Sequence, residues 1–355
     1  MTSKERVMAA LEFGQPDRVP LFDSYWPEWT QMWRAAAPGR EQTSPEDHYG
    51  VDIKIAVGDE SLAPSRAETL EQTDDYTVRR DGWGRIMRTV PDGYFYQQIE
   101  NGLEDPAGLD GLQFDPPHMP ERYAGLDAAM PGLKDRYCVF AKVGGPFIRT
   151  YFVRGEVNYL MDMAGDPAFA KELTMRIADH LIAIGIEELR RWDLYDTGIW
   201  IFDDMASNQG PVFSPATADE VLVPAWAKMV DSFKAAGARK VIMHSDGNIG
   251  PLLDRFVELG FDGINPVEPK AGLNALKLRE KYGSKLALLG GICNASILPL
   301  GNDRQLREHV LEVLAAGREG GLVIGTHSIG PDISVRQYEQ FFRLLSQYGG
   351  YPLKQ

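Results

Sequence analysis

From residue 137 onward the chain alternates short apolar runs with longer amphipathic segments. Six apolar runs have the length of buried strands: residues 137–143, 197–202, 240–243, 263–267, 286–289 and 322–324. Between them lie segments with helical spacing, at residues 156–163, 167–191, 217–236, 249–259, 273–282 and 303–316. Strands that alternate with helices in this way predict βαβ units and a parallel sheet.

The N-terminal part of the chain is less regular. Residues 3–13 have one apolar face and predict a helix, and residues 19–22 form a short apolar run. Residues 23–135 are irregular and rich in proline, glycine, aspartate and aromatic residues. Within them, residues 76–80 and 85–90 are two β-prone runs around a glycine-containing turn, which predicts a hairpin.

The strand count predicts the fold class. Six strands, the run at residues 19–22 and one more strand in the irregular region would give eight, the number in a closed (β/α)8 barrel of the TIM type. An open doubly wound sheet is the alternative, but its usual glycine-rich nucleotide motifs are missing from the sequence. No repeat or linker divides the chain, so we expect a single domain over residues 1–355. The N-terminal helix and the irregular segment, residues 1–135, would pack on the barrel.

Composition narrows the function. A formal charge of −14 argues against nucleic acid or an anionic membrane as a partner, since both are polyanions. No run approaches the ~20 apolar residues of a membrane span, and the charged N-terminus has no signal-peptide core. Cys138 and Cys293 are too few for a disulfide framework. We expect a soluble cytoplasmic protein.

Polar side chains follow five consecutive strands at the point where each ends. The chemistry-bearing residues at these ends are Asp203 with Asp204, His244 with Asp246, Glu268, Cys293 and His327. A single buried His or Asp is more often a hydrogen-bonded structural group, and a single Cys an apolar filler. In a parallel barrel, however, all these ends face one cavity. A divalent cation or a proton network would offset the cost of burying them together.

Histidine, thiolate and carboxylate are the ligands that zinc prefers. We therefore predict zinc on His244, Cys293 and His327, with Asp246 or Glu268 as a fourth ligand or a supporting group. Zinc lowers the pKa of a bound thiol or water and so produces a nucleophile at neutral pH.

Two further segments are candidates for substrate binding. Tyr25 and Trp26 follow the first strand and would line an aromatic pocket, with core packing under a lid as the alternative. Phe147 ends a Gly-Gly-Pro-Phe segment that lets a ligand approach the backbone. Arg149 would hold a carboxylate, with a surface ion pair as the alternative.

Several motifs together point to one family. They are Ser3–Val7, Arg18–Pro20, Gly144–Phe147, Ser214-Pro215, His244–Gly247, Pro266–Pro269, Gly290–Ile292 and His327–Ile329. Because it carries these motifs, the chain resembles the uroporphyrinogen decarboxylase superfamily, particularly its methyltransferase-like branch. The resemblance implies a TIM-like barrel, in agreement with the strand count.

The resemblance also separates two activities. The true decarboxylases carry an Arg-Gln-Ala-Gly-Arg segment after the first strand, whose arginines bind propionates, and residues 22–29 lack it here. The methyltransferase branch holds zinc with a His-x-Cys pair and a later Cys. This chain has His244-x-Asp246 instead, with His327 near the later Cys position and Cys293 where relatives often have Asp.

The first functional hypothesis is a zinc-dependent methyltransferase. It would move a methyl group between a small methylated substrate or thiol and a corrinoid carried by a separate partner protein. Asp204, Glu268 and Asp246 are the candidate catalytic residues, and a second copy of the chain is the other partner considered. The alternative is a decarboxylase acting on a porphyrinogen or a smaller acid, in which Arg149 anchors the carboxylate. A binding protein with a metal-free pocket is the third.

Overall fold

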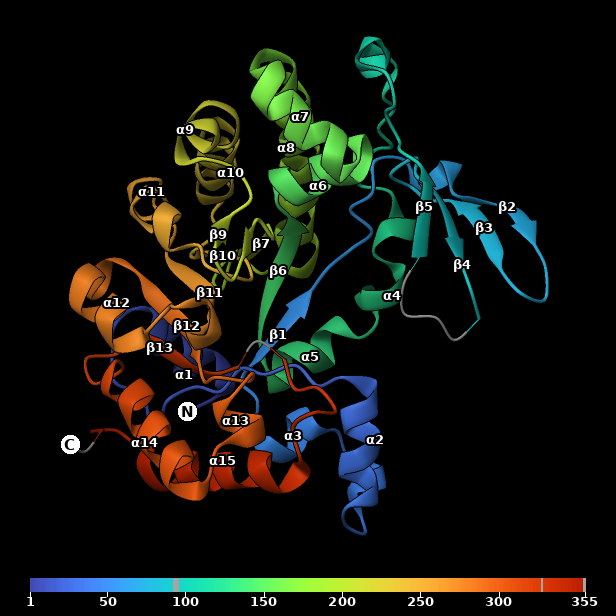
Figure 1. Ribbon diagram of the computed structural model, residues 1–355. Coiled ribbons are helices and arrows are strands. Elements are labelled where there is room, and N and C mark those ends of the chain that lie inside the picture. The colour runs from blue at the N-terminus through green and yellow to red at the C-terminus, as the bar shows by residue number, and fades with distance from the viewer. Residues whose placement is uncertain (92–95, 327, 354–355) are drawn as a thin grey trace.

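The computed structural model describes residues 1–91, 96–326 and 328–353 (Figure 1). Its centre is a curled sheet of seven parallel strands in the order β1-β6-β7-β10-β11-β12-β13. The strands are β1 (Ile53–Ala56), β6 (Cys138–Gly144), β7 (Ile199–Phe202), β10 (Val241–His244), β11 (Gly263–Val267), β12 (Ala287–Gly291) and β13 (Leu322–Gly325). The six predicted strands and their parallel direction are confirmed, and β1 is the additional strand of the irregular region.

The run at residues 19–22 lies between the two outer strands of this sheet. Phe22 N donates to the carbonyl of Ile324 in β13 (3.0 Å), and Ile324 N donates to Pro20 (2.9 Å). On the other side, the N–H of Asp52, just before β1, donates to the carbonyl of Leu21 (2.8 Å). Among the described residues the run therefore pairs with β13 through an isolated bridge between Leu21 and Ile324, whereas β1 and β13 are regular strands.

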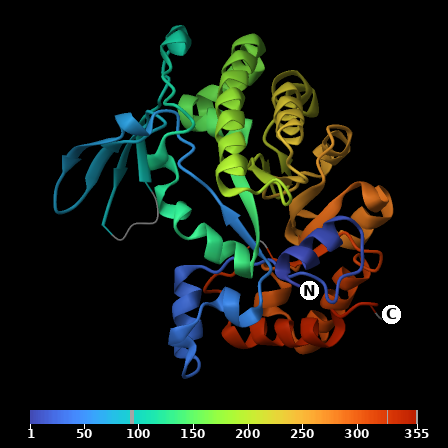
Figure 2. The ribbon, with the colours of Figure 1, turned by 180° about the vertical axis from the view of Figure 1, so that it is seen from behind.

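Helices cover the outside of the curled sheet (Figures 1 and 2). The longer ones are α2 (Pro27–Ala35), α6 (Pro146–Arg154), α7 (Glu156–Gly165), α8 (Pro167–Trp192), α10 (Val223–Ala235), α12 (Ala275–Tyr282), α14 (Asp303–Ala315) and α15 (Val335–Tyr348). Shorter ones are α3 (Pro45–Tyr49), α4 (Ala124–Asp127), α5 (Met130–Arg136), α9 (Pro215–Thr217), α11 (Leu253–Glu258) and α13 (Ile297–Leu300). All six predicted inter-strand helices are present. The helix expected over residues 249–259 begins only at Leu253, because Pro251 lies in a 3₁₀ turn, Gly250–Leu252, that precedes it.

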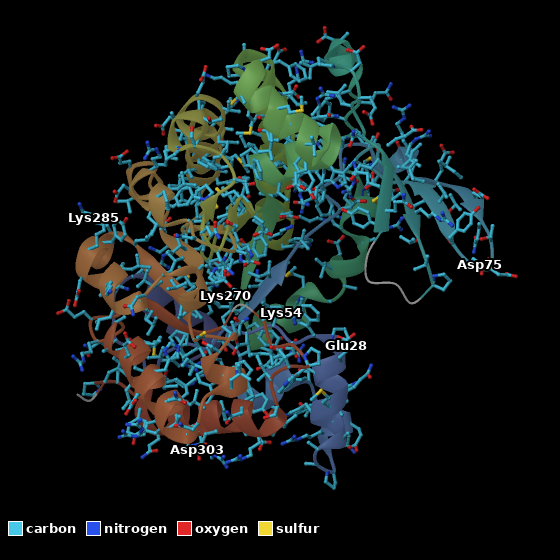
Figure 3. The ribbon with its side chains drawn as sticks, viewed as in Figure 1. Glu28, Lys54, Asp75, Lys270, Lys285 and Asp303 are labelled. Carbon is cyan, nitrogen blue, oxygen red and sulfur yellow. The ribbon has the colours of Figure 1, made fainter. Side chains whose placement is uncertain are left out.

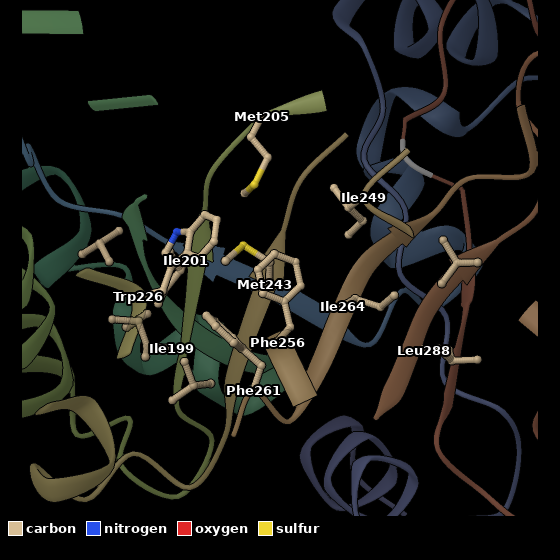
Figure 4. Packing of buried hydrophobic residues seen from close by; sticks show 14 of the residues in the cluster. Ile199, Ile201, Met205, Trp226, Met243, Ile249, Phe256, Phe261, Ile264 and Leu288 are labelled. Atoms are coloured by element: carbon tan, nitrogen blue, oxygen red, sulfur yellow. The ribbon is translucent and has the colours of Figure 1, made fainter. Parts of the chain in front are cut away.

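The strands separate two apolar layers, because successive side chains of a strand point to opposite faces. Ile199, Ile201 and Met243 point outward and pack with Trp226 and Phe256 of the surrounding helices (Figure 4). The inner layer is a second cluster, whose strand residues are Ile53, Cys138, Phe140, Trp200, Ile242, Ala287, Leu289 and Val323.

The first helix, α1 (Ser3–Leu11), completes the inner layer from the N-terminal end of the strands (Figure 2). Its buried Val7, Met8 and Leu11 belong to the inner cluster, and the carbonyl of Ala10 accepts from Gly321 N (2.7 Å), just before β13. Thr2 and Glu5 start the helix with a capping box, which satisfies two of its free N–H groups. The predicted helix at residues 3–13 is thereby confirmed, ending at Leu11.

A separate antiparallel sheet lies beside the barrel-like body. It comprises β2 (Glu68–Gln72), β3 (Thr77–Arg80), β4 (Ile86–Thr89) and β5 (Tyr96–Glu100) in sequential order. The predicted hairpin is the β3–β4 pair. Asp75 marks the outer tip of this sheet, whereas Lys270 lies near the middle of the molecule (Figure 3). A two-stranded ribbon, β8 (Ala206–Ser207) and β9 (Gly210–Pro211), follows β7. None of the helices in the described ranges combines the length and apolar character needed to span a bilayer.

Candidate metal centre

Three of the predicted residues meet where β7 and β10 end. His244 is the last residue of β10, Asp246 follows it by two, and Asp204 follows the end of β7 by two. His244 Nε2 lies 3.8 Å from an oxygen of Asp204 and 3.8 Å from an oxygen of Asp246. One ligand atom from each residue lies within 4.8 Å of the others. The two carboxylate side chains are 51% and 40% exposed, so the group is open to solvent at the carboxyl ends of the strands.

The orientation of His244 suits a metal ligand. Its Nδ1 lies 2.7 Å from the Oδ1 of Asn265, whose Nδ2 in turn donates to the carbonyl of Leu289 (3.4 Å). An amide oxygen can only accept, so Nδ1 carries the hydrogen and the neutral ring keeps its lone pair on Nε2. Nε2 is the atom that faces the two carboxylates. The ring of Phe202 stacks on the imidazole, with centroids 3.9 Å apart and planes 11° from parallel, and fixes its plane.

The loop after β10 is held by two carboxylates. Asp246 N donates to Asp204 Oδ1 (3.0 Å), which couples the loops that follow β7 and β10. Gly247 N donates to Glu268 Oε2 (2.7 Å), and Lys270 Nζ lies 3.0 Å from Glu268 Oε1. Glu268 is buried and supports the backbone next to Asp246, outside the group of three ligand atoms.

The donor set fits a divalent cation. One imidazole nitrogen and two carboxylate oxygens are ligands for zinc and for other first-row metals. With metal–ligand bonds of about 2.1 Å, two ligand atoms of one ion lie at most about 4.2 Å apart. The two 3.8 Å separations at His244 are within that limit, and the half-exposed aspartates can turn. His327, the other predicted imidazole ligand, lies outside the described residues.

Cys293 is not brought into this group. Its Sγ lies 3.2 Å from Ser296 Oγ, and its N–H donates to His309 Nε2 (3.0 Å). It lines a cavity of about 230 Å³ together with Lys270, His309 and Glu312. Burial raises the pKa of the Cys293 thiol, but hydrogen bonds from Ser296 and from the N–H groups of residues 295–297 outweigh it, so the pKa lies below its ordinary value.

Tyr25 and Trp26 have different surroundings. The Tyr25 hydroxyl bonds to that of Tyr338, and its ring packs on Trp29 with centroids 5.1 Å apart, so Tyr25 belongs to an aromatic cluster between α2 and α15. Trp26, at the start of α2, is 46% exposed. A residue that sequence reasoning missed lies nearby: the buried Asp23 accepts from Tyr338 (2.8 Å) and from the N–H and hydroxyl of Thr326, directly after β13.

The neighbours Asp203 and Asp204 have separate roles. Asp203 is buried and accepts from the N–H groups of Phe147 (3.3 Å) and Ile148 (2.8 Å) at the start of α6, and from Trp226 Nε1 (2.8 Å). Burial raises the pKa of Asp203 to about 7. Phe147 is buried against Tyr159 and Phe213. Asp203 and Phe147 therefore hold α6 on the sheet, and Asp204 alone of the pair reaches His244.

Arg149 belongs to a buried ionic cluster that the sequence reasoning did not anticipate. Glu60, from the loop after β1, lies 3.1 Å from Lys142 Nζ and also binds Arg149 and the N–H of Gly144. The Lys142 ammonium lies 5.2 Å from the ring centroid of Phe202, the same ring that stacks on His244. One sequence signal was present: a lysine interrupts the otherwise apolar run of β6.

A curled parallel sheet flanked by helices, with polar side chains gathered at the carboxyl ends of its strands, defines a protein of the TIM-barrel type. The family model for uroporphyrinogen decarboxylase (URO-D) matches residues 90–348, and the chain belongs to this family. No curated protein matches the chain by sequence.

Solved structures agree with the fold. A methyltransferase from Methanosarcina mazei is similar over 98% of this chain and 99% of its own, with a TM-score of 0.68 and 16% identity. A B12-independent methionine synthase from Shewanella sp. W3-18-1 (TM-score 0.44, 12% identity) covers 93% of this chain and 95% of its own. A putative vitamin-B12 independent methionine synthase from Listeria monocytogenes (TM-score 0.43, 11% identity) covers 93% and 96%.

Proposed function

We propose that this chain is a metal-dependent methyltransferase. It moves a methyl group between a small methylated substrate or thiol and a corrinoid carried by a partner protein. The observation that carries the proposal is the convergence of His244 Nε2 with the carboxylates of Asp204 and Asp246. Membership of the URO-D family and the fold shared with the methyltransferase from Methanosarcina mazei support it.

In this proposal zinc is held by His244, Asp204 and Asp246, with His327 as the remaining ligand. When bound, zinc would supply Lewis-acid activation of a thiol or of the heteroatom that carries the methyl group. Asn265 keeps the His244 lone pair on Nε2. Asp204 accepts the Asp246 N–H at Oδ1, which leaves its Oδ2 to take the proton of an incoming thiol. Glu268 keeps the turn at Gly247 in place.

The wider architecture in this proposal is a single domain. Residues 19–22 would act as the eighth strand and close the barrel, since they already pair with β13 and accept a bond from the residue before β1. Closure directs every strand end to one opening, where substrate and corrinoid partner would meet.

A decarboxylase that acts on a small acid is the second candidate. The observation that favours it is the pair of cations on Glu60, Lys142 beside Phe202 and Arg149, because a carboxylate substrate needs such groups. A porphyrinogen carries many carboxylates and would need more cations than this pair. In that reaction Asp204 or Asp246 would return a proton to the carbanion.

Metal analysis separates these functions. We expect stoichiometric zinc in the purified protein, loss of zinc in His244→Ala, and retention in the matched control Cys293→Ser, whose thiol bonds to Ser296. Incubation with methylcobalamin and candidate thiols should then give the colour change of demethylation in the wild type and in Cys293→Ser, but not in His244→Ala. Folded protein without metal would refute the methyltransferase proposal. Loss of zinc in Cys293→Ser would instead assign the thiol as a ligand.

A further inference from the structure

The ionic cluster of Glu60, Lys142 and Arg149 has more hydrogen-bond donors than acceptors. Among the described residues, the Lys142 ammonium and the Arg149 guanidinium each make one hydrogen bond, and both go to Oε1 of Glu60. The side chains are only 11% and 14% exposed, so water replaces few of the missing bonds. Arg149 Nε is fully buried and has no hydrogen-bond partner among those residues. A guanidinium carries five N–H groups and an ammonium three.

The cluster also has more positive than negative charge, just as it has more donors than acceptors. Burial opposes ionisation of Glu60, but Lys142 and Arg149 outweigh it and leave the Glu60 pKa below its ordinary value. Glu188, whose carboxylate accepts from the N–H groups of Gly58 and Lys142, is completely buried. Burial raises the pKa of Glu188 well above its ordinary value, which favours its neutral form. Two cations therefore face one carboxylate, and a buried excess charge is costly until an anion pairs with it.

The cluster lies close to the candidate metal centre. Lys142 follows Cys138 and Phe140 along β6 with the period of two that places all three on the inner face. Its ammonium lies 5.2 Å from the centroid of the Phe202 ring, and the His244 ring centroid lies 3.9 Å from the same point. The ammonium and the imidazole are therefore at most about 9 Å apart.

We propose that Lys142 and Arg149 form an anion subsite, and that the substrate is a small organic acid whose carboxylate binds there. Its methylated heteroatom then reaches His244 across the ring of Phe202. Glu60 acts as a positioning residue that holds the two cations in place. Because the ammonium and the imidazole lie so close together, only a small acid can contact both. This substrate assignment rests on the proposed methyl transfer, whereas the binding of an anion does not.

Matched ligand pairs test the subsite without any turnover. 4-Methoxybenzoate is compared with 4-methoxybenzamide, and 3-methoxypropionate with its amide, by calorimetry on the purified full chain with and without a metal chelator. We expect at least one acid to bind ten- to a hundredfold more tightly than its amide, the range typical of a charge-assisted hydrogen bond. In Lys142→Met and Arg149→Met the preference should fall below about threefold, while Lys142→Arg keeps it.

Lys228→Met is the matched control, because Lys228 is 46% exposed and pairs with Asp179 on the outer helices. The Lys228→Met variant should bind the acid in preference to its amide as strongly as the wild type does. Equal binding of acid and amide for both pairs in the wild type would overturn the subsite. So would a preference that survives in both methionine variants, since the cations would then only hold Glu60. If the preference is present but methylcobalamin is never demethylated, the anion subsite stands and the methyltransferase proposal fails.

Discussion

Replacing Asn265 by alanine tests the metal centre through a residue that does not touch the metal. The Oδ1 of Asn265 accepts from His244 Nδ1 at 2.7 Å and lies in a buried site. Without this acceptor, the imidazole loses the bond that keeps its lone pair on Nε2. The other tautomer, with hydrogen on Nε2, then competes with the metal.

The size of the effect follows from that single bond. Leaving a buried N–H without an acceptor costs about 1–3 kcal/mol. Losing the partner of a metal-binding histidine weakens metal binding about 10- to 100-fold, which corresponds to about 1.4–2.8 kcal/mol. Asn265→Ala should therefore bind zinc 10- to 100-fold more weakly than the wild type, and Asn265→Asp should bind it at least as tightly, because a carboxylate also accepts from Nδ1.

Competition with a chelator of known affinity measures these dissociation constants. Asn274→Ala is the control, because the Asn274 side chain caps α12 and makes no contact with His244 among the described residues. It should lose some stability and no zinc affinity. A zinc affinity of Asn265→Ala within twofold of the wild type would refute the assigned tautomer and, with it, the role of Nε2.

Two further predictions concern stability. Burial lowers the pKa of His180 to about 4; between pH 4 and 6.5 the folded protein thus binds fewer protons than the unfolded chain, and the unfolding free energy falls as the pH falls. His180→Gln should reduce that loss by up to about 3 kcal/mol, measured by urea unfolding at pH 7 and 4.5, and identical pH profiles would contradict it. Asp52→Ala removes the carboxylate that binds Arg6 and Arg18, and should lower the unfolding free energy by about 3 kcal/mol. Asp110→Ala, which removes an exposed partner of Arg176, should change the unfolding free energy by less than about 0.5 kcal/mol, because exposed ion pairs contribute little. An equal loss of stability in both variants would refute the argument.

The strands and two members of the candidate metal centre, His244 and Asp246, could be predicted because they depend on local patterns. An apolar run that ends in His244-Ser245-Asp246 is visible in the sequence, and parallel topology places its end beside Asp204. The direction in which each side chain points was harder to predict from the sequence. Asp203 and Asp204 are adjacent at a strand end, so they point to opposite sides, and only the fold shows which one meets His244.

Long-range pairing explains what the sequence did not show. Cys293 follows Gly290 and Gly291, which both have positive φ angles, and the turn leads its thiol to Ser296 instead of the metal-binding group. Lys142 and Glu60 are 82 positions apart and become partners only when β6 and the loop after β1 lie side by side. Such a pair has no signature in either local segment.

The way the first residues are packed has a consequence for biosynthesis. Residues 7–22 supply part of the inner layer, but their bonding partners around Gly321 and Ile324 are made roughly 300 residues later. At bacterial or eukaryotic translation speeds, roughly 15–60 s separate the emergence of these two segments from the ribosome. Throughout that interval the N-terminal segment lacks the part of its packing that β13 supplies, so we expect the nascent chain to need protection from aggregation until β13 has been made.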